Sequence, residues 1–85
     1  MIEILAVFKS RAQATDCNAR LKGLNINCAL IATPKECGVG CGLCVKFSQA
    51  VYPRAKAIIL RSGYSAFYGF CLMRSVYGKV TVTKV

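Results

Sequence analysis

Residues 26–47 read INCALIATPKECGVGCGLCVKF, and this stretch contains two strand-like patterns on either side of a glycine-rich loop. In a strand over residues 26–32, Ile26, Cys28, Leu30 and Ala32 would lie on one face, and Pro34 ends the pattern. Residues 43–47 alternate again, with Cys44 on the face opposite to its apolar neighbours. We therefore predict two strands joined by a surface loop, which is the kind of segment where function is often found.

The flanking sequence predicts two helices and three further strands. Ser10 can cap a helix over residues 10–24, and Pro53 fits the first turn of a second helical segment that ends at Gly63. Gly69 indicates a bulge in the strand that follows. The further predicted strands cover residues 2–8, 64–73 and 79–85. The order β-α-β-β-α-β predicts an α+β, ferredoxin-like split βαβ fold, with two helices on one face of an antiparallel sheet and an extra C-terminal strand.

Length and composition indicate one folded domain over residues 1–85. The chain is 55% hydrophobic, far above the level of disordered chains. It has no run of about 20 apolar residues that could form a transmembrane helix. The start, MIEILAVFKSR, does not resemble a signal peptide. We therefore expect a cytoplasmic location and no membrane partner.

The net charge of +9 arises from 12 basic residues against only Glu3, Asp16 and Glu36. Such an imbalance favours anionic partners through long-range attraction. An anionic protein that donates or accepts a chemical group is the partner we expect. Nucleic acid is a less favoured alternative, because the aromatic residues Tyr64, Phe67, Tyr68 and Phe70 look like core residues plus one exposed ring. A homodimer through the free edge of the last strand is left open.

Six cysteines in a chain from a reducing compartment favour metal binding or sulfur chemistry over disulfides. Cys17, Cys28 and Cys71 lie among apolar residues, where a cysteine acts as a small hydrophobe. The remaining cysteines stand in the loop with the spacing C-x3-C-x2-C, at positions 37, 41 and 44. Because glycine-rich loops bury side chains poorly, we expect these three to be the reactive ones.

Two chemistries suit this loop. A reactive thiolate needs donors or positive charge to lower its pKa, and Lys35 with the backbone N–H groups near Gly40 and Gly42 can supply them. Alternatively, Cys37, Cys41 and Cys44 could ligate zinc or an iron–sulfur cluster, with the fourth ligand from another cysteine or solvent because the chain has no histidine.

The chain also resembles a family of small bacterial proteins, the selenium/sulfur carrier-like proteins. The resemblance covers residues 4–73 and rests on ILAVFKS, the Ala14 to Leu21 helix, the strand ending ATP, the Cys41-Gly42 step and LCVKF. It implies that Cys41 is the family's cysteine and Gly42 its following glycine. Cys37, Cys44, the strong positive charge and the residues beyond Ser75 depart from the family pattern.

The resemblance implies a carrier that holds a persulfide or selenide on Cys41. From the loop itself, we expect Cys44 or Cys37 to release the carried atom or to resolve the bond. The absence of histidine and the three carboxylates leave few groups for general acid–base catalysis. This favours a carrier or binding module over an enzyme without deciding the question. We expect no cofactor. Metal binding and nucleic-acid binding remain the alternative functions.

Overall fold

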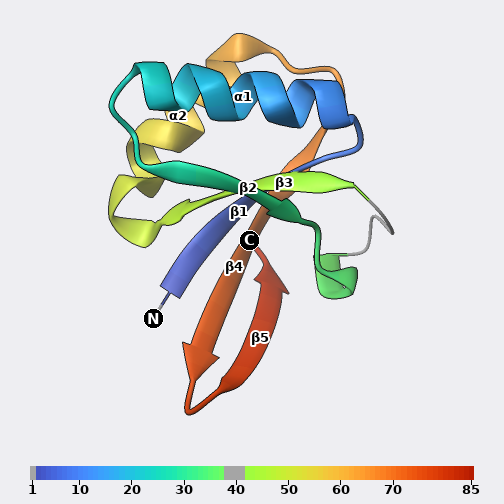
Figure 1. The fold of residues 1–85 in the computed structure, drawn as a ribbon, viewed down its shortest axis with the longest axis vertical. Coiled ribbons are helices and arrows are strands. Elements are labelled where there is room, and N and C mark those ends of the chain that lie inside the picture. The colour runs from blue at the N-terminus through green and yellow to red at the C-terminus, as the bar shows by residue number, and fades with distance from the viewer. Residues whose placement is uncertain (1, 38–41) are drawn as a thin grey trace.

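The computed structural model describes residues 2–37 and 42–85, and these residues form a helical layer packed on a five-stranded sheet (Figure 1). The elements are β1 (Ile2–Phe8), α1 (Arg11–Gly23), β2 (Cys28–Ala32), η1 (Lys35–Cys37), β3 (Leu43–Ser48), η2 (Gln49–Val51), α2 (Tyr52–Ser62), β4 (Phe67–Val76) and β5 (Lys79–Lys84), where η1 and η2 are short 3₁₀ helices. None of the described helices is long and apolar enough to cross a membrane.

The strand order is β2-β3-β1-β4-β5, and every neighbouring pair is antiparallel. Placing β1 between β3 and β4 is the arrangement of the split βαβ unit, to which β5 adds one strand. The predicted α+β ferredoxin-like fold is therefore confirmed.

Local sequence signals define the ends of both helices. The Ser10 hydroxyl accepts a hydrogen bond from the Gln13 N–H at 3.2 Å and caps α1. Pro53 lies in the first turn of α2, where its missing N–H costs nothing. Gly63 ends α2 in the left-handed conformation, with φ of 67°.

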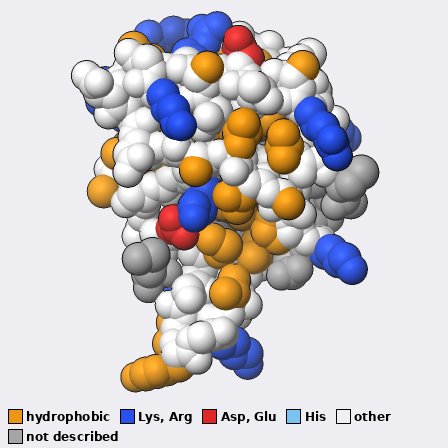
Figure 2. Space-filling model, viewed as in Figure 1, with side chains coloured by type: hydrophobic (Ala, Val, Ile, Leu, Met, Phe, Trp, Pro, Cys, Tyr) orange, Lys and Arg blue, Asp and Glu red, His pale blue; other side chains and the backbone are white. Residues whose placement is uncertain are grey.

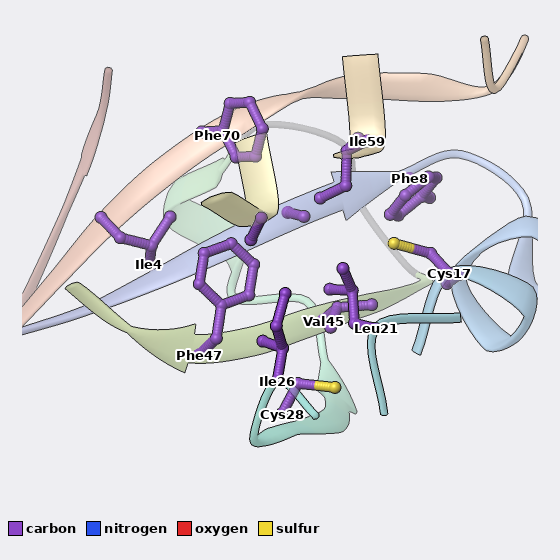
Figure 3. Close-up of a cluster of buried hydrophobic side chains, with 13 residues drawn as sticks. Ile4, Phe8, Cys17, Leu21, Ile26, Cys28, Val45, Phe47, Ile59 and Phe70 are labelled. Carbon is purple, nitrogen blue, oxygen red and sulfur yellow. The ribbon is translucent and has the colours of Figure 1, made fainter. Parts of the chain in front are cut away.

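The main hydrophobic core lies between the sheet and the two helices (Figure 3). Alternate residues of β1, such as Ile4 and Phe8, point into it and meet α1 residues such as Leu21. The Phe8 ring is fully buried and makes edge-on contacts with Tyr64 and Phe67, with ring centroids 5.4 and 5.5 Å apart. This layer fixes the strands on which the candidate site is built.

The opposite face of the sheet carries a second, smaller hydrophobic cluster. Its buried members are Leu5, Val7, Cys37, Cys44 and Cys71, and its partly buried members are Ile31, Tyr68, Met73 and Val82. Neither α-helix covers this face, and η1 supplies Cys37 to it. We call the nine residues of this cluster the thiol-face cluster. In Figure 2, hydrophobic side chains gather across the middle of the view, below the helices.

Candidate thiol site

A backbone hydrogen bond closes the connection between β2 and β3. The Thr33 N–H donates to the Gly42 carbonyl at 3.0 Å, so the pairing of the two strands continues one step into the loop. Gly42 has φ of +146°, which side chains other than hydrogen rarely allow. A Cβ at this position would also stand 3.4 Å from the Phe8 carbonyl oxygen. Glycine is therefore required where the loop rejoins the sheet.

Two of the predicted loop cysteines are buried. Cys37 on η1 is 4% exposed and Cys44 on β3 is fully buried, while Cys41 and Gly40 lie outside the described residues. The expected exposure of Cys37 and Cys44 is therefore wrong. The physical reason is that η1 directs Cys37 onto the sheet, and strand alternation directs Cys44 into the same thiol-face cluster.

Cys71 joins these two thiols, which the sequence analysis did not foresee. It was predicted to be an ordinary core cysteine, and it is buried, but within the thiol-face cluster and not under the helices. The available signal was its position next to Phe70, because neighbouring residues of a strand point to opposite faces and Phe70 is in the main core. Cys71 therefore belongs to the surroundings of the loop.

Cys44 and Cys71 cannot form a disulfide with each other in this arrangement. Cys44 lies opposite Val7 on one side of β1, and Cys71 lies opposite Leu5 on the other side. Two strand spacings separate their Cα atoms by at least about 9.5 Å. A disulfide needs Cα atoms within about 7 Å. The two thiols are neighbours of one cluster but not a redox pair.

Cys44 is a protonated thiol at neutral pH. Its pKa is raised to about 11, mainly by burial; the Thr33 hydroxyl and Lys46 act to lower it, and a charge on Cys71 acts to raise it. The buried Thr33 hydroxyl has no partner of ordinary hydrogen-bond geometry among the described residues. We take it as a weak donor that turns to Cys44 when the thiolate forms. A thiolate is the reactive species, so Cys44 is a poor nucleophile as it stands.

Cys17 and Cys28 are structural, as predicted. Both contribute to the main core, where Figure 3 shows Cys17 on the helix side of Phe8. The pKa of Cys17 is raised to about 12, mainly by burial, with smaller contributions from Cys28 and Asp16 that act against Arg20. Burial also raises the pKa of Cys28, against a smaller lowering effect of Lys22. The Cys28 thiol donates a hydrogen bond to the Asn18 side-chain oxygen at 3.2 Å.

Positive charge surrounds the thiol-face cluster, although part of it is neutralised. Lys46 forms an ion pair with Glu3 at 3.6 Å, which weakens its effect on nearby thiols. Lys35 is exposed on η1, consistent with access to an anion near the loop. The ammonium groups of Lys9 and Lys84 lie over the Tyr68 ring, 5.6 and 4.4 Å from its centroid. The outer side of the cluster is therefore basic.

The metal-site alternative gains no support from residues 2–37 and 42–85. Within them, no group of three or more histidine, cysteine or acidic side chains is arranged to hold a metal ion. The alternative ligand set was Cys37, Cys41 and Cys44, and Cys41 lies outside the described residues.

The aromatic residues also fail to form an exposed stacking surface. Tyr64, Phe67 and Phe70 pack against the main core, and Tyr68 lies on the other face beneath Lys84. RNA-binding sheets of this architecture stack bases on several exposed rings of one face. The described part of the sheet therefore offers no such platform.

Comparison with protein families identifies the family of this chain. Residues 3–68 match the family described as "Putative Se/S carrier protein-like". The chain belongs to this family. The match includes the whole β2–β3 connection with its cysteines, and it stops within β4, so that residues 69–85 lie outside the matched segment. Searches of curated proteins and of solved structures found no match to this member of the Se/S carrier-like family.

Proposed function

We propose that this protein is a sulfur or selenium carrier in which Cys41 holds the transported atom as a persulfide or selenide adduct. The observation that carries the proposal is the family match over residues 3–68, which includes Cys41. The burial of the other cysteines supports the assignment. A carrier thiol must reach a partner, and Cys17, Cys28, Cys37, Cys44 and Cys71 are all at most 7% exposed.

The transfer chemistry needs only a thiolate and a partner. The Cys41 thiolate attacks the outer sulfur of a donor persulfide, a new S–S bond forms on Cys41, and the donor leaves as its own thiolate. An acceptor nucleophile then attacks the outer sulfur, and Cys41 is released as a thiolate. Neither step consumes an external oxidant or reductant. The backbone N–H groups of Gly40 and Gly42 and the charge of Lys35 stabilise the thiolate in this proposal.

Cys37 and Cys44 take a secondary role. Attack by one of their thiolates on the inner sulfur of the Cys41 persulfide would form a disulfide and release hydrosulfide. Their burial, and the pKa of about 11 for Cys44, slow this reaction while the loop remains folded. Burial of the neighbouring thiols therefore protects a loaded carrier from premature release.

The partner is an anionic protein in this proposal. The chain has no histidine and only three carboxylates, so activation of donor or acceptor falls to the partner. The net charge of +9 accelerates encounter with an acidic surface. The same protein would thus act between two enzymes and not as an enzyme itself.

The test is to load the reduced protein with glutathione persulfide under anaerobic conditions and to map the product by peptide mass spectrometry. We expect one added sulfur, about 32 Da, on the peptide that contains Cys41. Cys41→Ser should abolish loading, while Cys44→Ala should load normally and keep its sulfur longer. Loading of Cys41→Ser to the level of the unmodified protein, or sulfur spread over all six cysteines, would remove the proposal.

A further inference from the structure

We propose that the outer edge of β5 binds an extended, acidic segment of the partner protein, which adds to the sheet as a further strand. The inference rests on the proposed function only in one respect: it takes the partner to be the protein that donates sulfur to Cys41 or accepts it. The edge itself, its charges and its place near η1 are features of the described residues.

Within residues 2–37 and 42–85, the outer edge of β5 has no strand paired to it. β5 is the last strand of the sheet order and pairs only with β4 among the described residues. A two-residue turn of Tyr77 and Gly78, both with positive φ, joins the two strands. In such a hairpin the residues that flank the turn form a hydrogen-bonded pair, so Lys79 directs its groups toward β4.

Alternation along the strand identifies the residues whose backbone N–H and C=O groups point away from β4. The Val85 N–H donates to the Phe70 carbonyl at 3.0 Å, which agrees with odd-numbered residues facing β4. The N–H and C=O groups of Val80, Val82 and Lys84 therefore point away from β4. These are the groups that an added strand pairs with.

Side chains along this arm leave apolar surface uncovered. Figure 1 shows the β4–β5 hairpin projecting away from the helices. Val80 is 52% exposed and Val76 is 45% exposed, and Tyr77 at the tip is fully exposed. A hollow of about 400 Å³ lies between the strands' side chains and is lined by Arg74, Val76, Tyr77, Lys79 and Thr81. Val76 pairs with Lys79 and Val80 pairs with Ser75, so the two valines and the hollow do not form one surface: Val80 lies on the opposite face of the hairpin from Val76 and the hollow. A valine of an incoming strand can pack beside Val80.

The charge of the arm selects an acidic segment. The sequence contains no Asp or Glu after Glu36, whereas the arm carries Arg74, Lys79 and Lys84. Lysines on an edge strand are a common device that discourages pairing with a second copy, and Lys79 and Lys84 stand at the two ends of β5. Acidic side chains at the ends of a partner strand would instead oppose these lysines.

The other edge of the sheet lacks these features. β2 is five residues long and has no charged residue. β5 also packs against η1, and Val82 belongs to the thiol-face cluster with Cys37. A segment bound to β5 would therefore lie near η1 and Cys37. Because the family match stops at residue 68, β5 is a docking device outside the segment shared with the family.

The experiment titrates the ¹⁵N-labelled full chain with a short peptide of about eight alternating glutamate and valine residues, the length of an ordinary strand. We expect the largest amide shifts at Val80, Val82 and Lys84. An alternating lysine–valine peptide and a single-stranded oligothymidylate serve as probes of a different charge and a different class. We expect the glutamate peptide to bind more weakly at 1 M salt, because charges more than about 3 Å apart are largely screened at that ionic strength.

Variants separate backbone pairing from charge. Val80→Pro removes one outward N–H and should lower the affinity for the glutamate peptide at least about fivefold. The matched Val80→Thr keeps this N–H, and its affinity should stay within about twofold of that of the unmodified protein. Lys79→Glu should weaken binding at least about threefold. Lys56→Glu, the same charge change on α2, should not. Lys79→Glu remains informative if proline disturbs the hairpin.

Several results would overturn the docking proposal. These are shifts centred on β2 or the helices, equal binding of the lysine peptide, competition by the oligothymidylate, or concentration-dependent β5 shifts without peptide. The proposed function fails separately, because peptide binding does not need Cys41. Cys41→Ser should bind the glutamate peptide normally. If the unmodified protein binds the peptide but takes up no sulfur on Cys41, the carrier role alone is removed.

Discussion

Replacing Gly42 by alanine tests whether the loop is held to the sheet as described. Gly42 has φ of +146°, in a region that only glycine occupies readily, so a side chain there costs about 1–3 kcal/mol in backbone strain. The added Cβ would stand 3.4 Å from the Phe8 carbonyl oxygen, which is close but not a severe clash. Strain therefore dominates, and Gly42→Ala should lower the free energy of unfolding by about 1–3 kcal/mol.

The assay is urea and thermal unfolding of the reduced protein, followed by circular dichroism. For a domain of this size, each kcal/mol moves the melting temperature by about 4–8 °C, so we expect a fall of roughly 5–20 °C. Gly23→Ala is the matched control, because Gly23 lies in α1 with nothing within 4 Å of its added Cβ. It should stabilise the protein by about 0.5–1 kcal/mol. A Gly42→Ala protein as stable as the unmodified chain would refute the reasoning.

Three further predictions concern the thiols, the pH dependence and the hairpin turn. Under limiting iodoacetamide, peptide mapping should find Cys41 labelled first and the five buried cysteines only on unfolding; early labelling of Cys44 would contradict its burial. Because the pKa of Cys44 is raised in the folded state to about 11 from 9.0, its contribution to stability is complete below about pH 9 and is lost as the pH rises toward 11. The urea midpoint of the unmodified protein should therefore fall more steeply over that range than that of Cys44→Ala, and parallel curves would show the raised pKa to be wrong. Tyr77→Asn should raise stability by about 0.5–1 kcal/mol in urea unfolding, because Asn-Gly suits two successive residues of positive φ better than Tyr-Gly does. A loss of stability there would mean that the exposed Tyr77 ring contributes packing.

Much of the fold could be predicted because its signals are local. Pro53 and Gly63 mark the two ends of α2, and the bulge predicted at Gly69 appears as a register shift between Val7 and Phe8 of the paired strand. The end of α1 was less well predicted. The helix predicted over residues 10–24 ends at Gly23, and the left-handed residue beyond it is Asn25, with φ of 64°. Asparagine tolerates this conformation.

The burial of the site could not be predicted in the same way. Alternation correctly placed Cys44 on the face away from Val45, but it does not reveal what covers that face. The cover comes from Cys37, Cys71 and Val82, which belong to three separate elements and meet only through the strand order. Loop composition suggested exposure, and tertiary packing decided otherwise.

The central position of β1 has a consequence for synthesis in the cell. Both strands that pair with β1 are made after it, since β3 begins at Leu43 and β4 at Phe67. Translation at roughly 5–20 residues per second leaves the apolar segment from Ile2 to Phe8 without either neighbour for seconds. Even after β3 appears, one side of β1 stays unpaired until β4 leaves the ribosome. The sheet can therefore be completed around its first strand only when most of the domain has been made.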